Sequence, residues 1–406
     1  MAQRSVSRSI LQQTVNALAD ANGNQAEAAT KLGAKLTTFK HRVQLAKAGG
    51  VAPIGRRAND PKVLQFEVKR LRAELKRAQE KELSEEVIRR SIISLAKNAA
   101  ETSAPAWLAK PARKPSAPGV PTLFLSDLHW GEVVKPAQIN GVNEYNVAIA
   151  HKRIDTLAES AVQLLRILNP AMDYPGLVLL LGGDMISGNI HEELAATNEI
   201  NTMPTVLDLF GKLASFIKGM ADQFGAVFVP CVTGNHGRNT RKTWNKDRHH
   251  TSFDWLLYCF LAKHFEHDKR ITFQIPDSSA AYFKIYGYRY WLEHGDQFKG
   301  GDGVIGSLGP IIRGDHRKRS RNAQVDMEYD TMLLGHWHQY MHLTRLIVNG
   351  SLKGYDEYAF NNSFPFERPQ QALWLTHPKY GITYRMPVYV DKQRAAPKTT
   401  WVSVPQ

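Results

Sequence analysis

The segment Leu123–Trp130, LFLSDLHW, places an aspartate and a histidine directly after a run of large apolar residues. Such a run is typical of a buried β-strand, so Asp127 and His129 lie where a strand would pass into a loop. Four later segments repeat this arrangement: LVLLLGGD with Asp184, VFVPCVTGNH with Asn235 and His236, YWLEHGD with His294, and MLLGHWH with His336 and His338. Strand runs and helical patterns alternate over 119–390, which predicts a mixed α/β or α+β domain there.

The polar groups of the five segments share the chemistry of metal ligands. In extended backbone, residues i and i+2 point to the same side, so Asp127 pairs with His129, and His336 pairs with His338. Carboxylate, imidazole and amide oxygen suit a borderline divalent ion such as manganese, iron or zinc. Two ions ~3.5–4 Å apart that share a carboxylate would use all of these groups, whereas one ion needs fewer. Each segment alone has a simpler interpretation as a turn, but five turns in this order are a rare coincidence.

The motifs D-x-H, G-D, G-N-H, H-G and G-H-x-H resemble, in type and order, those of the calcineurin-like metallophosphoesterases, over residues 123–351. The resemblance implies a four-layer β-sandwich flanked by helices, with two divalent ions at one edge. Manganese is the expected metal, and iron and zinc are the alternatives. The implied ligands are Asp127, His129 and His338 for one ion, Asn235, His294 and His336 for the other, and Asp184 as the bridge. His236 would be the catalytic proton donor or charge stabiliser.

Two basic segments flank the motifs, and a positive rim beside a phosphoesterase centre suits a polyanionic substrate. In the segment after the third motif, Trp244, His249 and His250 would stack on bases. The candidate substrate-binding residues are Arg238, Arg241 and Lys242 from this loop, and Arg317, Lys318 and Arg319 from a second loop before the last motif. Solvated charged loops are the alternative interpretation of both segments.

The order of the motifs is also similar to that of the DNA-repair exonuclease branch of the family and of phage and bacterial phosphoesterases. The first hypothesis is therefore a metal-dependent DNA nuclease that hydrolyses phosphodiester bonds. The alternatives are a small-molecule or cyclic-nucleotide phosphodiesterase or phosphatase, and a DNA-binding regulator with a degenerate phosphoesterase domain. Intact residues at every motif argue against the last of these. The sequence does not distinguish exonuclease from endonuclease, or DNA from RNA.

Residues 1–50 predict a small all-α domain of three short helices. Apolar spacing predicts the first over 7–21 and the second over 25–32, with Asn24 as its cap, and the third begins at about Thr37. Within these helices, Leu32 and Leu36 are expected in the small core, together with Ala28, Ala29, Phe39 and Val43.

Two short helices joined at a glycine are typical of a helix-turn-helix, and the segment 23–42 resembles the Fis-type motif. The resemblance implies that the third helix binds DNA in the major groove. The residues that would face DNA are Thr37, Thr38, Lys40, His41 and Arg42. A small helical bundle that binds protein is the alternative.

The chain has 406 residues and a formal net charge of +14, and most of the excess lies near its start. Residues 1–118 hold 22 Lys and Arg against 10 Asp and Glu. This basic arm favours nucleic acid, before an anionic membrane, as a partner. The region 51–118 contains an a/d seam, that is, apolar residues at the a and d positions of about two heptads, and then a proline-rich linker. The seam predicts a helix over 62–80 that forms a homodimer, packs on the enzyme domain or stays solvated.

No apolar run approaches the ~20 residues that a membrane helix needs, so no membrane partner is expected. Two cysteines cannot form a disulfide framework, and the N-terminus lacks the apolar core of a secretory signal. A cytoplasmic location follows as the expectation, with Cys231 as a buried thiol. The tail 391–406 is expected to be flexible.

Overall fold

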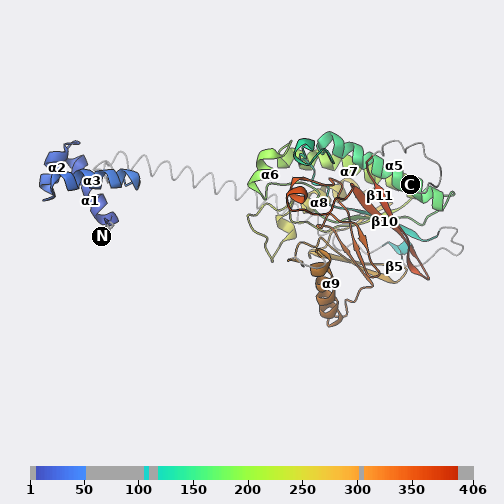
Figure 1. Cartoon of the computed structure of the whole chain (residues 1–406). Helices are drawn as coiled ribbons and strands as arrows, with labels where there is room; N and C mark the ends of the chain where they lie inside the picture. Colours follow the sequence, from blue (N-terminus) through green and yellow to red (C-terminus); the bar gives the residue numbers. More distant parts are fainter. Residues whose placement is uncertain (1–5, 52–104, 109–117, 301–305, 392–406) are drawn as a thin grey trace, which may run out of the picture. The chain divides into compact units, whose positions relative to one another are not determined.

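The computed structural model describes residues 6–51, 105–108, 118–300 and 306–391. Contacts divide the chain into two units, residues 1–88 and 89–406, and each is described by itself (Figure 1). The predicted helix over 62–80, most of the linker and the tail from 392 lie outside the described residues. The dimer through 62–80 therefore stays a prediction.

The first unit contains the three predicted helices: α1 (Arg8–Asp20), α2 (Gln25–Lys31) and α3 (Leu36–Ala48). The predicted cap of α2 is also confirmed, because the Asn24 side chain accepts hydrogen bonds from the amides of Ala26 and Glu27 at 3.1 and 3.3 Å. These bonds satisfy two of the amides that the first turn of a helix leaves without a partner.

The core of this unit is smaller than predicted. Phe39 is fully buried among small side chains, including Ala28 and Ala29. Leu32 and Leu36, which were expected in this core, are 38% and 40% exposed, so that prediction is wrong. These two leucines flank the turn between α2 and α3. They stay partly exposed because Phe39 already fills the interior of the unit.

The second unit is built on two mixed sheets. The first has the order β11-β10-β1-β2-β3-β4 and the second the order β5-β6-β7-β9-β8. The strands of the first sheet are β1 (Val120–Leu125), β2 (Leu177–Leu181), β3 (Val227–Pro230), β4 (Ile271–Gln274), β10 (Gln370–His377) and β11 (Gly381–Tyr389). Those of the second are β5 (Ala280–Ile285), β6 (Tyr288–Glu293), β7 (Thr331–Leu334), β8 (Met341–His342) and β9 (Leu346–Val348).

Helices cover the outer faces of the two sheets. Figure 1 shows α5 and α7 along one side of the second unit and α9 on the opposite side. The helices of this unit are α5 (Val147–Leu168), α6 (Glu192–Thr197), α7 (Thr202–Phe224), α8 (Phe253–His264), α9 (Leu308–Ala323) and α10 (Glu357–Asn361). Its short 3-10 helices are η2 (Ala106–Leu108), η3 (Pro136–Gln138) and η4 (His249–Thr251). None of the helices in the described ranges is long and apolar enough to cross a membrane.

Alternating side chains divide the interior into layers. On β1, Leu123 and Leu125 pack with the helices, whereas Phe124 packs between the two sheets. On β7, Leu333 faces the space between the sheets, and Met332 packs in the outer cluster that contains residues of α9. Both faces of β1, β2, β3 and β7 are buried, which explains their continuous apolar runs. The predicted mixed domain of packed sheets flanked by helices is confirmed.

The second unit begins earlier than the predicted domain start at 119. Leu108, in η2, is buried in the core between the sheets, and its carbonyl accepts a hydrogen bond from the Tyr286 amide at 2.7 Å. The ring of Trp107 packs against Gly176, where a Cβ atom would lie 2.7 Å from the ring. These residues of the predicted linker are therefore part of the second unit.

Candidate metal centre

Parallel strand pairing gathers the five motifs at the carboxyl ends of their strands. β1, β2 and β3 run parallel, so the residues that follow them, including Asp127, Asp184 and Asn235, lie at one edge of the first sheet. β6 and β7 also run parallel and are followed by His294 and His336. The segments that supply the site are thus far apart in the sequence and adjacent in the fold.

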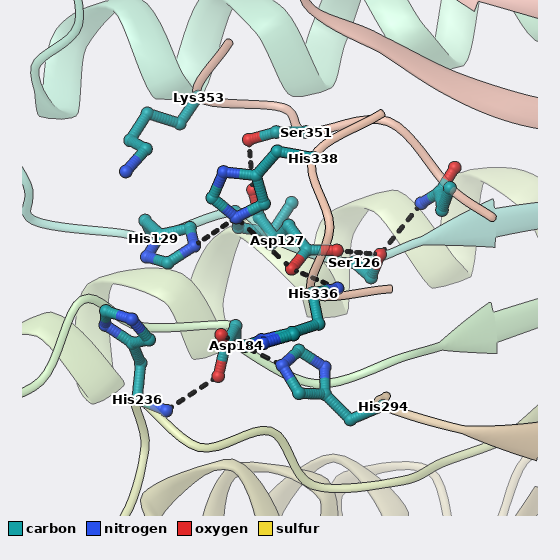
Figure 2. Close-up of polar contacts among 12 residues, drawn as sticks. Ser126, Asp127, His129, Asp184, His236, His294, His336, His338, Ser351 and Lys353 are labelled. Atoms are coloured by element: carbon teal, nitrogen blue, oxygen red, sulfur yellow. Dashed lines mark hydrogen bonds and ion pairs between the residues drawn. The ribbon is translucent and has the colours of Figure 1, made fainter. Parts of the chain in front are cut away.

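Six of the predicted metal ligands form two groups, and within each group the ligand atoms lie within 4.8 Å of one another (Figure 2). The groups are Asp127, His129 and His338, and Asp184, His294 and His336. A third group of His129, Asp184 and His236 joins them. In the first group, the Nε2 atoms of His129 and His338 are 3.0 Å apart. In the second, His294 Nε2 lies 3.0 Å from Asp184 Oδ2. The site therefore contains two adjacent sets of ligands, each with one carboxylate and two imidazoles.

Backbone amides fix both carboxylates in place. His336 donates its amide hydrogen to Asp127 Oδ1 at 2.9 Å, and Ser126 Oγ donates to Oδ2 at 2.5 Å. His236 donates its amide hydrogen to Asp184 Oδ1 at 2.7 Å. Because the donors come from neighbouring motifs, each aspartate connects two of the loops.

The surroundings of the Asn235 side chain show whether the site suits a metal ion. Its Oδ1 is buried and has no hydrogen-bond partner within the described part of the chain. A Cβ on the preceding residue, Gly234, would overlap the carboxylate of Asp184, so the asparagine follows a turn that lies directly against that carboxylate. A buried acceptor without a partner is costly unless a donor or a cation meets it. The donor set and this oxygen together fit borderline divalent ions.

The ligand loops have an unusual backbone. Five site residues have φ between 47° and 69°: Asp127, His129, Asp184, His336 and His338. Such values are uncommon outside glycine and cost of the order of 1–3 kcal/mol each. The expectation that Asp127 and His129, and likewise His336 and His338, lie in extended backbone is therefore wrong. The side chains of Asp127 and His129 still reach the site, because the backbone after β1 continues to pair with the segment after β2: the amides of Asp127 and His129 donate to the carbonyls of Gly183 and Asp184, each at 3.1 Å.

Burial and charge set the protonation state of the histidines. Burial lowers the pKa of His129 to about 3, and the positive charge of Lys353 adds to the effect. Burial and His294 lower the pKa of His336 to about 4. Both rings are neutral near pH 7, the state in which an imidazole binds metal. Burial opposes the charged form of His294 too, but the Asp184 carboxylate outweighs it and raises the pKa to about 10.

A buried chain of charges lies behind His129, and sequence analysis missed it. His129 Nδ1 is 3.3 Å from Glu132 Oε2, and Glu132 Oε1 accepts a hydrogen bond from Lys353 Nζ at 2.8 Å. Lys353 also pairs with Asp356 at 2.5 Å, and the two carboxylates raise its pKa against the opposing effect of burial. A carboxylate behind a metal-binding histidine orients the ring. No spacing rule connects these residues, so only the fold brings them together.

Asp254, in the first turn of α8, is a further residue that sequence analysis missed. It is fully buried and accepts hydrogen bonds from the amides of Asp184, Met185 and Gly234 at 3.1, 3.2 and 2.9 Å. Burial and the nearby Asp184 raise its pKa to about 7. It holds the loops after β2 and β3 against each other.

His236, the predicted catalytic residue, borders the centre. Its Nδ1 lies 3.0 Å from the carbonyl oxygen of Ser187, and its ring meets that of His129 edge-on, with 4.5 Å between centroids. Donation from Nδ1 to this carbonyl leaves Nε2 without the ring proton. Burial lowers the pKa of His236, although Asp184 opposes this. His236 is therefore neutral near pH 7, with a basic Nε2.

The predicted substrate-binding residues have different surroundings. Arg238 borders the centre and donates from Nη1 to the Asn235 carbonyl at 2.8 Å, and Arg241 and Lys242 are exposed on the loop that follows. The second segment is helix α9, so the expectation of a basic loop there is wrong. On this helix, Lys318 pairs with Glu293 at 2.7 Å and Arg319 with Asp315 at 2.8 Å, whereas Arg317 is exposed. Substrate contact at all of these positions stays a prediction.

The predicted DNA-binding residues lie on α3 of the first unit. Four of them, Thr37, Thr38, Lys40 and His41, are exposed, and Arg42 is half-buried. Their exposure leaves α3 with a polar and basic surface. DNA binding by this surface stays a prediction.

No protein-family model matches the chain, and no curated protein matches it. Among solved structures, the chain is similar to a conserved uncharacterized protein, a predicted phosphoesterase, from Streptococcus pneumoniae: identity 10%, 66% of this chain and 97% of that chain covered, TM-score 0.25. It is also similar to Vacuolar Protein Sorting 29 from Cryptosporidium parvum (11%, 64% and 86%, 0.26) and to the Thermus thermophilus sulfate thiohydrolase SoxB in complex with glycerol (9%, 69% and 58%, 0.28). A likeness with TM-scores this low does not identify a function, so the geometry of the site has to carry that inference.

Proposed function

We propose that the second unit is a metal-dependent phosphoesterase of the calcineurin-like type that hydrolyses phosphodiester bonds. The observation that carries this proposal is the pair of buried ligand groups joined through Asp184, with the unpartnered oxygen of Asn235 beside them. The proposed ligands are Asp127, His129 and His338 on one side, and Asn235, His294 and His336 on the other. Two divalent ions bound there, with manganese as the expected metal, would polarise phosphoryl oxygens and make water more acidic.

The protein's own groups position the reaction. His236 borders the joined groups and is not one of the proposed ligands, so its neutral Nε2 would accept the proton that water loses. Water adds to phosphorus as the P–O ester bond breaks, and the proton lost by water ends on the leaving oxygen, to which protonated His236 supplies it. Asp127 and Asp184 keep their orientation during this step through the amides of His336 and His236.

We propose DNA as the substrate class and the first unit as the targeting element. The exposed basic side chains of α3 and of the loop after the third motif support this, because a polyanion gains from several separate cations. A small diester is the second candidate. The ion pairs of Lys318 and Arg319 favour this candidate. Both cations are already neutralised by carboxylates of the protein, so they are less available to a polyanion.

The test is hydrolysis after chelation and re-addition of manganese, with bis-p-nitrophenyl phosphate and end-labelled single- and double-stranded DNA as substrates. Asp184→Asn removes the shared negative charge, and Asp155→Asn is the matched control, an exposed aspartate on α5 paired with Lys212. Manganese-dependent hydrolysis by the wild type and the control, lost in Asp184→Asn, supports the proposal. Full activity of Asp184→Asn, or no hydrolysis by the wild type, overturns it. Cleavage of the small diester alone selects the second candidate.

A further inference from the structure

The loop 238–252 is closed at its neck and placed beside the proposed centre. Arg238 and Ser252 form an antiparallel bridge, and the Asn239 amide donates to the Thr251 carbonyl at 2.8 Å. At one end the loop follows Asn235 closely, and at the other it enters α8. Compact surface loops with paired ends are frequently functional. The fixed neck therefore holds the rest of the loop near the ligand groups.

A small cavity of about 10 Å³, the space of roughly one water molecule, lies between this loop and the third motif. Its wall includes Asn235, Arg238, Trp244 and Arg248. A nucleobase is too large to enter this space, so it would stack on the exposed ring of Trp244 at the rim. Because Asn235 belongs both to this wall and to the proposed ligands, a base at the rim would adjoin the reacting phosphate.

The two arginines of the cavity wall are held in place by the protein. Arg238 donates to the carbonyls of Asn235 and Thr240 at 2.8 and 3.1 Å. Arg248 donates to Asp296 at 2.7 Å. Fixed guanidinium groups attract phosphate without the entropy cost of ordering a free side chain. Arg238 is thus available to a phosphate of a polyanion, whereas the charge of Arg248 is balanced by Asp296.

Trp244 gives the cavity its flat apolar surface. Its side chain is 51% exposed, and exposed cations surround it in the sequence at Arg241, Lys242 and Lys246. An exposed aromatic ring among cations is the usual way to bind single-stranded nucleic acid, because unpaired bases stack on the ring. The stacking expected of His249 and His250 is not supported, since these rings lie 3.9 Å apart and pack near Trp255.

We infer that the ring of Trp244, at the rim of this cavity, stacks on an unpaired nucleobase next to the scissile phosphate, so that the preferred substrate is a single strand or a frayed end. The inference rests on the proposed phosphodiesterase function, because it places the base beside the reacting group. In a duplex, each base is paired and stacked, and extruding it costs a few kcal/mol. A duplex therefore binds less well at this site.

The test is a double-mutant cycle on the full-length protein in chelator, with fluorescence anisotropy as the readout. The probes are labelled oligothymidylate and an abasic oligomer of equal length. We expect Trp244→Ala to weaken binding of oligothymidylate about tenfold and binding of the abasic oligomer less than about twofold. Trp244→Phe should retain most of the affinity. An excess of unlabelled duplex DNA occupies the first unit in every measurement, so that its binding does not mask the change at Trp244.

The control variant is Tyr380→Ala. Tyr380 is 69% exposed and lies in the turn after β10, which the pairing of β10 with β1 places at the opposite end of the sheet from the site. Equal losses on both oligomers, or no loss, overturn the base site. In metal-loaded protein, Trp244→Ala should raise the KM for single-stranded DNA by more than the KM for bis-p-nitrophenyl phosphate. If the wild type hydrolyses neither substrate, the phosphodiesterase proposal fails, while the binding cycle still reports on the base site.

Discussion

The carboxylate of Asp254 accepts a hydrogen bond from the backbone amide of Asp184 at 3.1 Å, across 70 positions of sequence. It also accepts one from the Gly234 amide at 2.9 Å. One buried side chain therefore sets the distance between the proposed bridging ligand and the loop that carries Asn235. Gly237 leaves the room for this, because a Cβ there would lie 2.7 Å from Asp254 Oδ1.

Removal of this carboxylate should disorganise the centre. Asp254→Ala leaves three buried amides without an acceptor, at about 1–3 kcal/mol each. We expect metal affinity to fall at least tenfold and kcat to fall more than KM rises, with Asp254→Asn intermediate because one oxygen remains. Metal content after dialysis and steady-state kinetics measure this, with Asp155→Asn as the control. Wild-type metal content in Asp254→Ala would contradict the role.

Replacement of His236 should separate catalysis from metal binding. We expect His236→Ala to keep its metal content and to lose about 10²–10⁴-fold in kcat on DNA. The loss should be smaller on bis-p-nitrophenyl phosphate, because p-nitrophenolate leaves without needing a proton and a nucleoside oxygen does not. Metal analysis and kinetics on both substrates decide the matter. Equal losses on both would refute proton transfer, and a loss of metal would make His236 a ligand.

The ion pair behind His129 should stabilise both the fold and the metal site. Lys353→Met leaves Glu132 and Asp356 as buried, unpaired carboxylates, so the free energy of unfolding should fall by about 3–5 kcal/mol. The double variant Glu132→Gln/Lys353→Met should recover part of this, because one of the two carboxylates is neutral. Glu132→Gln alone should weaken metal binding about 10–100-fold. Urea unfolding and metal titration provide the measurements; additive effects of the two substitutions would argue against coupling.

The sequence was sufficient for the parts of the site that local patterns encode. Apolar runs followed by polar motifs predicted which strands carry Asp127, Asp184 and His294, and parallel pairing then brought those strand ends together. The cap at Asn24 was equally local. In each case, a few adjacent residues determine the outcome.

Tertiary contacts determined what the sequence did not reveal. Asp254 and Lys353 occur in segments with no motif, and only folding brings them against the ligand loops. The carboxylate of Asp127 accepts a hydrogen bond from the amide of His336, which follows β7 of the other sheet. The basic segment before the last motif is a helix because Ile311 and neighbouring apolar residues pack it on the outer face of that sheet, which charge alone does not indicate.

DNA affinity should depend on α3 of the first unit. Lys40→Ala should reduce affinity for duplex DNA uniformly across sequences and lower the slope of log affinity against log salt by about one, as expected for one phosphate contact. The matched control is Lys31→Ala, a lysine on α2 that pairs with Glu27 at 2.9 Å. Affinity measurements over a salt series test this. If the two variants behave alike, α3 is not the DNA-binding helix.

A half-buried histidine away from the centre should make the fold sensitive to acid. His342, on β8, has an Nε2 atom that is buried without a hydrogen-bond partner in the described structure, and burial and Arg385 lower its pKa to about 3. The unfolded chain, with a pKa near 6.5, binds the proton more readily, so this contribution to stability is complete above pH 6.5 and is lost as the pH falls toward 3. One proton gives a slope of at most about 1.4 kcal/mol per pH unit, and the partial exposure of the ring reduces it. In chelator, His342→Gln should lose less stability than the wild type between pH 6.5 and 4, whereas the exposed control His267→Gln should follow the wild type. Parallel pH profiles for all three proteins would show that His342 does not bind its proton on unfolding.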